Sequence, residues 1–118
     1  IKAAFVKQLG GFNGEFWLDY LDHWLCRMIF LSKKKMYISS AVIKHELSVA
    51  DYNTVSVQRA LNILQAEMLF YRYYKPWSER VLYVFRLLCR SLKQYATLKN
   101  KQIACNTFSA VWRSIMRR

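Results

Sequence analysis

The segment over residues 14–32 constrains the fold most, because its apolar side chains repeat at helical spacing. They fall three or four residues apart at Trp17, Leu21, Trp24, Met28 and Leu31. This spacing places them on one side of an α-helix. We therefore predict a long helix over residues 14–32.

The composition indicates one folded domain over residues 1–118. A hydrophobic content of 54% in 118 residues can fill one core, and three Gly and one Pro leave no room for a flexible linker. The longest apolar run, Trp24 to Leu31, is interrupted by Arg27 and is far shorter than the roughly 20 residues that cross a bilayer. We expect a soluble protein that has no membrane partner.

The cysteines predict neither a disulfide framework nor a metal centre. Cys26, Cys89 and Cys105 are widely spaced, with no C-x-x-C pair and no histidine at ligand spacing. Reduced, mostly buried thiols in a cytoplasmic protein are the expected state. The chain also lacks a glycine-rich phosphate loop and a carboxylate cluster, so we expect no cofactor and no enzymatic activity.

The charge favours a polyanionic partner. The net charge is +12, and residues 81–118 carry eight basic side chains and no acidic one. Lys and Arg that neutralise phosphates release condensed counterions, which drives binding to nucleic acid. We expect double-stranded DNA as the partner and a location in the cytoplasm at the nucleoid.

The order of the remaining segments predicts a winged helix-turn-helix, a mainly α fold with a small β-hairpin wing. Met36, Tyr37 and Ile38 suggest a short strand, and residues 40–67 suggest two helices, 40–47 and 54–67, joined by a polar turn. Residues 69–87 hold two runs rich in aromatic and β-branched residues around Pro76, which predicts two strands and a loop. Helical spacing returns over residues 88–118, as one bent helix or two shorter ones.

Two segments carry a family resemblance. The stretch SVQRALNILQAEMLFYR, residues 56–72, resembles the recognition-helix segment of MarR-type regulators, and KPWSERVLYVFRL resembles their wing. The Lys-rich, aromatic character is most similar to the SarA branch, and a fainter similarity links the helix-turn-helix and the terminal VWRSIMRR to CaiF/GrlA-type activators. The pattern departs from the family at Met68, where a glycine is usual, and at Ser78, where an aspartate is usual. The resemblance implies DNA binding.

This interpretation assigns a role to each candidate site residue. The helix over residues 54–67 would enter the major groove and bring to the base edges Asn53, Thr54, Ser56 and Gln58. The phosphate contacts would come from Lys33, Lys34, Lys35, Lys44 and Arg59. The wing over residues 73–80 would place Lys75 and Arg80 at the minor groove.

The predicted function is transcriptional regulation by a homodimer, because a single recognition helix buries too little surface for strong specificity. The terminal helices, the first 14 residues with residues 103–116, are the expected dimer contact. A plasmid or phage replication or partition factor is one alternative. A winged-helix module that binds an acidic protein is another.

Overall fold

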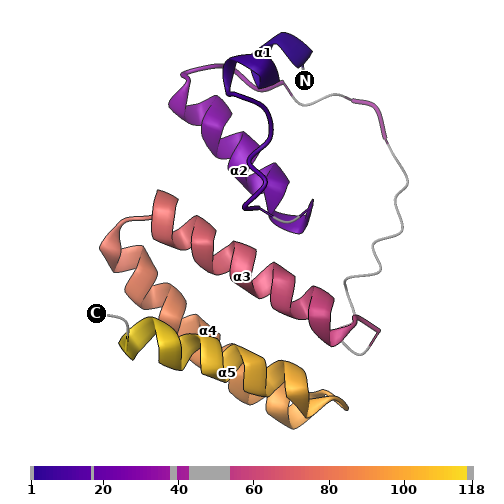
Figure 1. Ribbon diagram of the computed structural model, residues 1–118, viewed down its shortest axis with the longest axis vertical. Helices are drawn as coiled ribbons and strands as arrows, with labels where there is room; N and C mark the ends of the chain where they lie inside the picture. Colours follow the sequence, from indigo (N-terminus) through magenta and orange to yellow (C-terminus); the bar gives the residue numbers. More distant parts are fainter. Residues whose placement is uncertain (1, 17, 38–39, 43–53, 117–118) are drawn as a thin grey trace. The chain divides into compact units, whose positions relative to one another are not determined.

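The computed structural model describes residues 2–16, 18–37, 40–42 and 54–116, and over these residues it is α-helical without a strand. The chain divides into two compact units, Ile1–His45 and Glu46–Arg118. Figure 1 shows the helices, which are α1 (Ala3–Gln8), α2 (Leu18–Leu31), α3 (Val57–Tyr74), α4 (Trp77–Thr97) and α5 (Lys101–Met116). None of the helices in the described ranges is long and apolar enough to cross a membrane.

The first unit contains α1 and α2, and both helices end in a left-handed turn. Gly10 follows α1 with φ 81°, and Lys33 follows α2 with φ 54°. After α2, the N–H of Lys34 donates to the carbonyl of Ile29 at 3.1 Å, which closes a Schellman turn. The predicted helix is thus present, although it begins at Leu18. The buried side of this helix differs in part from the predicted one, because Leu25 and Ile29 are buried and Leu31 is exposed.

The second unit is a bundle of α3, α4 and α5 in which consecutive helices run antiparallel and are joined by short turns (Figure 1). α3 begins at a cap, where the Oγ of Ser56 accepts a hydrogen bond from the N–H of Arg59 at 3.2 Å. α5 begins in the same manner, where the Oδ1 of Asn100 accepts from the N–H of Gln102 at 3.0 Å. Because α4 runs antiparallel to both of its neighbours, α3 and α5 are parallel to each other.

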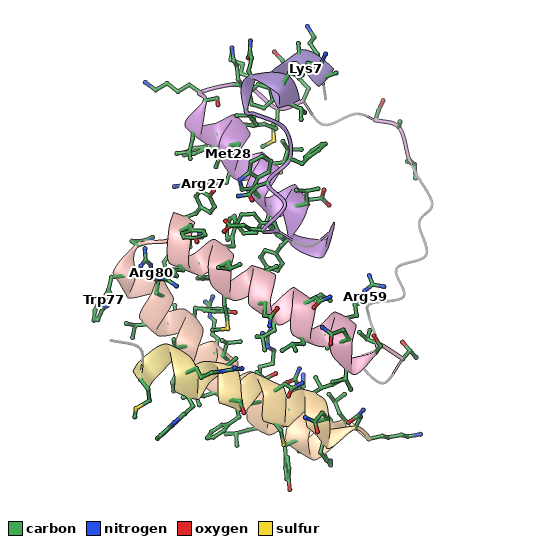
Figure 2. The ribbon with its side chains drawn as sticks, in the orientation of Figure 1. Lys7, Arg27, Met28, Arg59, Trp77 and Arg80 are labelled. Carbon is green, nitrogen blue, oxygen red and sulfur yellow. The ribbon has the colours of Figure 1, made fainter. Side chains whose placement is uncertain are left out.

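The predicted β-hairpin wing over residues 69–87 is wrong. These residues form the last turns of α3 and the first half of α4, and the only break is at Lys75 and Pro76. Lys75 is extended, with φ −115° and ψ 142°, as expected for a residue that precedes proline. Figure 2 shows Trp77 and Arg80 at this corner between two helices, where the prediction had a loop between two strands. The expected strand at Met36 and Tyr37 is also absent, and Ile38 lies outside the described residues.

Two apolar clusters hold the bundle together. In the larger one, Leu64 of α3 packs with Tyr83 and Leu87 of α4 and with Ala110 and Val111 of α5. The smaller cluster, at the other end of α3, joins Ala60 to Leu98 and Ile103. The buried residues of α4 follow the helical period, three or four residues apart, at Tyr83, Leu87, Ser91 and Gln94. The same aromatic and β-branched residues that suggested strands therefore pack as helices.

Candidate nucleic-acid interface

The residues predicted to contact bases lie at the start of α3. Thr54, Ser56 and Gln58 are exposed there, but the Ser56 hydroxyl serves as the helix cap. The Nε2 of Gln58 donates to the Oδ1 of Asn62 at 2.9 Å, one turn further along the helix. Asn53 lies outside the described residues. Of the predicted group, Gln58 is the side chain that projects from the body of α3.

The residues predicted for the wing belong to the helix corner. The Nζ of Lys75 pairs with Glu79 at 2.9 Å, and the Nε of Arg80 donates to the carbonyl of Lys75 at 2.7 Å. Lys75 also lies 16 residues after Arg59, so a rise of about 1.5 Å per residue puts the two backbones roughly 24 Å apart. Figure 2 places Arg59 and Arg80 at opposite ends of α3. The corner therefore does not extend the surface at the start of α3 as a wing would.

The other predicted phosphate contacts are spread over the chain. Lys33, Lys34 and Lys35 follow α2 in the first unit and are exposed. Arg59 is half-buried at the start of α3. Lys44 lies outside the described residues, as does the predicted helix 40–47 from residue 43 onward. The predicted helix-turn-helix therefore has only its second helix within the described part of the chain.

Polar side chains form one continuous face along α3 and α5, which the sequence analysis did not identify. On α3 they recur every three to seven residues, and on α5 every four or seven. The members of this polar face are Gln58, Asn62, Gln65 and Arg72 of α3 and Gln102, Asn106 and Arg113 of α5. No acidic residue is among them.

The line where α3 meets α5 connects these two rows. Leu61 of α3 and Asn106 of α5 line the same small pocket of about 10 Å³. Gln65 follows Leu61 by one turn, and Gln102 precedes Asn106 by one turn, so the rows border the same contact line. Because α3 and α5 are parallel, the amides lie at the starts of both helices, and Arg72 and Arg113 lie toward their ends.

The amides repeat one arrangement on both helices. Gln58 donates to Asn62 at 2.9 Å, and Gln102 donates to Asn106 through the same atoms at 3.2 Å. Each pair still presents one amide oxygen as acceptor and one NH₂ group as donor. A donor and an acceptor held side by side suit the edge of adenine in the major groove.

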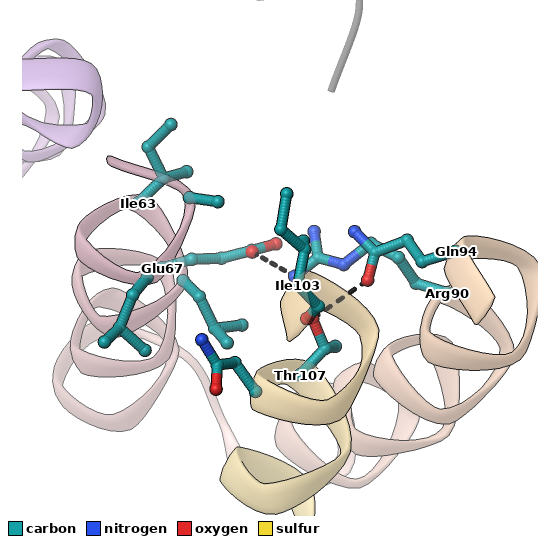
Figure 3. Close-up of a pocket in the computed structure, with 10 residues that line it drawn as sticks. Ile63, Glu67, Arg90, Gln94, Ile103 and Thr107 are labelled. Carbon is teal, nitrogen blue, oxygen red and sulfur yellow. Dashed lines mark hydrogen bonds and ion pairs between the residues drawn. The ribbon is translucent and has the colours of Figure 1, made fainter. Parts of the chain in front are cut away.

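The bundle carries a large positive excess. Residues 54–116 include ten Lys or Arg and only two acidic residues, Glu67 and Glu79. Both carboxylates are engaged, since Glu67 pairs with Arg90 at 2.7 Å and Glu79 pairs with Lys75. Figure 3 shows the Glu67–Arg90 pair bridging α3 and α4, beside the bond from Thr107 to Gln94 at 2.9 Å. These bonds fix the packing of the helices, and residues 54–116 keep a net excess of basic over acidic side chains.

A basic groove lies between α3 and α4. It has a volume of about 210 Å³ and is lined by Glu67, Tyr71, Tyr83, Arg86, Leu87 and Arg90. The rings of Tyr71 and Tyr83 stack across it at 3.9 Å. Arg86 adds an exposed guanidinium at its edge. The groove is a second surface that could accept an anion.

The cysteines differ from the expectation that they are mostly buried. Cys26, Cys89 and Cys105 are free thiols, as expected, but all three are exposed. Over the described ranges, no group of three His, Cys, Asp or Glu side chains could hold a metal ion.

No family model, curated protein or solved structure matches this chain. The resemblance to MarR-type regulators stays a prediction from the motif alone.

The signal for the polar face was present in the sequence. Gln58, Asn62, Gln65 and Arg72 follow helical spacing, but the prediction ended the helix at residue 67 and assigned Arg72 to a strand. The contribution of α5 could not be found in this way. It depends on which side of α5 packs against α3, and that is a property of the bundle.

Proposed function

We propose that this chain binds double-stranded DNA through the polar face of α3 and α5. The observation that carries the proposal is the pair of equivalent Gln–Asn contacts at the starts of two parallel helices, continued by Arg72 and Arg113. In this proposal α3 enters the major groove. The amides then meet base edges, and the arginines meet phosphates on the groove wall.

The charge of the bundle supports a polyanionic partner. Ten basic and two acidic side chains over residues 54–116 attract phosphate over a distance, and the polar face contains no carboxylate that would repel it. Regulation of transcription from the cytoplasmic nucleoid is the role that we propose for such binding. The proposal needs no wing.

The test compares variants in DNA binding at one fixed salt concentration. A preferred duplex is first selected from a random library, and affinity is then measured for it and for a scrambled duplex. Gln58→Ala should reduce the preference for the selected duplex by up to about 1–3 kcal/mol, the value of one good base contact. Arg72→Ala should weaken binding to both duplexes, since a phosphate contact carries no sequence information.

Two matched controls locate the surface. Gln8→Ala removes an exposed glutamine from α1, and Arg86→Ala removes an exposed arginine from the α3–α4 groove with the same change in net charge as Arg72→Ala. Both should bind nearly as the unmodified chain does. If Arg86→Ala lowers the affinity for DNA more than Arg72→Ala does, the DNA binds at the α3–α4 groove instead. If Gln58→Ala lowers the affinity for both duplexes equally, α3 does not read bases.

A further inference from the structure

A second surface of the bundle is apolar and exposed. Five aromatic side chains of α4 and α5 each expose between 52% and 67% of their surface, and Leu92 exposes 70%. The members of this apolar face are Trp77, Phe85, Leu92 and Tyr95 of α4 and Phe108 and Trp112 of α5. None carries a charge at neutral pH.

These side chains lie on the sides of α4 and α5 that point away from α3. On α4, Tyr83 stacks on Tyr71 of α3. Leu92 follows Tyr83 by nine residues, which is about two and a half turns, so Leu92 lies on the opposite side of α4. On α5, Ile103 packs with Ala60 of α3, and Trp112 likewise follows by nine residues. Each row therefore faces away from α3.

The two rows meet along the line where α4 packs on α5. Val84 and Leu88 pack against the cluster that contains Ala110 and Val111 of α5, and Phe85 and Leu92 lie just outside them. At one end, the Nζ of Lys101 lies 5.3 Å from the ring centre of Tyr95 and also donates to the Tyr95 carbonyl. The rows thus form one face that covers both helices.

The area of this face approaches what each partner buries in a stable dimer. A Phe, Tyr or Trp side chain has about 150–250 Å², so the five aromatics together expose roughly 600 Å². That reaches the upper end of the roughly 300–600 Å² of the largest apolar patch on a typical monomer. With Leu92 and the aliphatic side chains between, it approaches the roughly 800 Å² that each partner buries in a standard interface.

We propose that this face binds a second copy of the chain through a two-fold contact of α4 and α5. Charge repulsion between two chains of net charge +12 restricts where they can meet, and the six members of the apolar face carry no charge, with Lys101 beside Tyr95 at one end. A pair of antiparallel helices packs on an equivalent pair as in a four-helix bundle. The contact is formed by α4 and α5 together and leaves the polar face of α3 and α5 open.

Sedimentation of the full chain over a range of concentrations tests this proposal. At about 1 M salt, where the screening length falls to about 3 Å, the unmodified chain should form dimers. Phe85→Glu should raise the dimer dissociation constant roughly tenfold or more, since it puts a carboxylate into an apolar contact. Tyr73→Glu is the matched control, because it also replaces an exposed aromatic side chain by a glutamate, but on α3. It should dimerise as the unmodified chain does.

The circular dichroism of Phe85→Glu should match that of the unmodified chain, because the side chain is mostly exposed. If it does not, Leu92→Glu replaces it. The proposal is overturned if the unmodified chain stays monomeric, if the folded variant dimerises unchanged, or if Tyr73→Glu has the same effect. The proposal is also overturned if the chain binds anionic phosphatidylserine vesicles as a monomer and Phe85→Glu abolishes this binding. The partner of the apolar face would then be a membrane surface.

Thiol labelling gives an independent measurement. Cys105 is exposed one turn before Phe108, whereas Cys26 lies on α2. Maleimide labelling of single-cysteine variants should slow at least severalfold at Cys105 as the concentration rises through the dimer dissociation constant, and should not change at Cys26. A rate at Cys105 that is independent of concentration would contradict the proposed interface.

Discussion

The two carboxylates of the bundle make ion pairs in different surroundings. Glu67 of α3 pairs with Arg90 of α4, and the two side chains are 14% and 32% exposed. Glu79 pairs with Lys75 one turn away, and its side chain is 46% exposed. The first contact joins two helices and the second only bridges the corner, so their contributions to stability should differ.

We expect Glu67→Ala to lower the free energy of unfolding by about 1–3 kcal/mol, because it leaves a half-buried guanidinium without its carboxylate. Glu79→Ala, the matched control, should cost about 0.5 kcal/mol or less, as an exposed pair between neighbouring turns does. Urea unfolding of both variants measures the difference. Equal losses would contradict the bridging role of the Glu67–Arg90 pair.

At the scale of the element, α4 separates two apolar surfaces. Its buried row, which includes Tyr83 and Leu87, packs on α3 and α5, and its exposed row includes Phe85 and Leu92. A helix that is apolar on two sides is typical of one that has a contact on each side. The polar side chains of α4 that remain, such as Arg86 and Lys93, lie between these rows.

Two leucines of α4 test this orientation. Leu87→Ala should destabilise the protein by about 2–5 kcal/mol, because Leu87 is 1% exposed and its loss leaves a cavity. Leu92→Ala should change the stability by about 0.5 kcal/mol or less when the protein is dilute and monomeric, because Leu92 is 70% exposed. Thermal or urea unfolding measures both. Comparable losses would show that α4 is rotated from the described orientation.

At the scale of the whole molecule, the charge of +12 should give the two proposed contacts opposite responses to salt. Binding to DNA should weaken as salt rises, with a slope of about 0.9 per phosphate contact, since counterions are released. Self-association should strengthen over the same range, because salt screens the repulsion between like-charged chains and leaves the apolar contact intact.

Parallel titrations of one preparation measure both effects, with anisotropy of labelled DNA for the first and sedimentation for the second. DNA binding that is independent of salt would contradict a phosphate-dominated contact. Self-association that weakens with salt would indicate an interface held by charges rather than by the apolar face.

The sequence by itself determined those features that depend on neighbours along the chain. The spacing of Trp24 and Met28 predicted α2, Lys33 marks its end, and the basic excess of the last residues follows from counting. The start of the third helix was predicted at residue 54, three residues before α3 begins, although Ser56, which caps the helix, had been assigned to base contact. These features depend on residues that are close in the sequence and not on contacts between distant segments.

The tertiary structure decided the state of residues 69–87 and the faces of the bundle. Aromatic and β-branched residues such as Phe70, Tyr83 and Val84 have a modest preference for strands, which packing readily overrides. In the bundle, Tyr83 and Leu87 bury their side chains against Leu64 and Val111, and within α3 and α4 the backbone hydrogen bonds form inside each helix. Which side chains then face solvent depends on how three helices pack, so the contribution of α5 to the polar face, and the apolar face of α4 and α5, were decided by the tertiary structure.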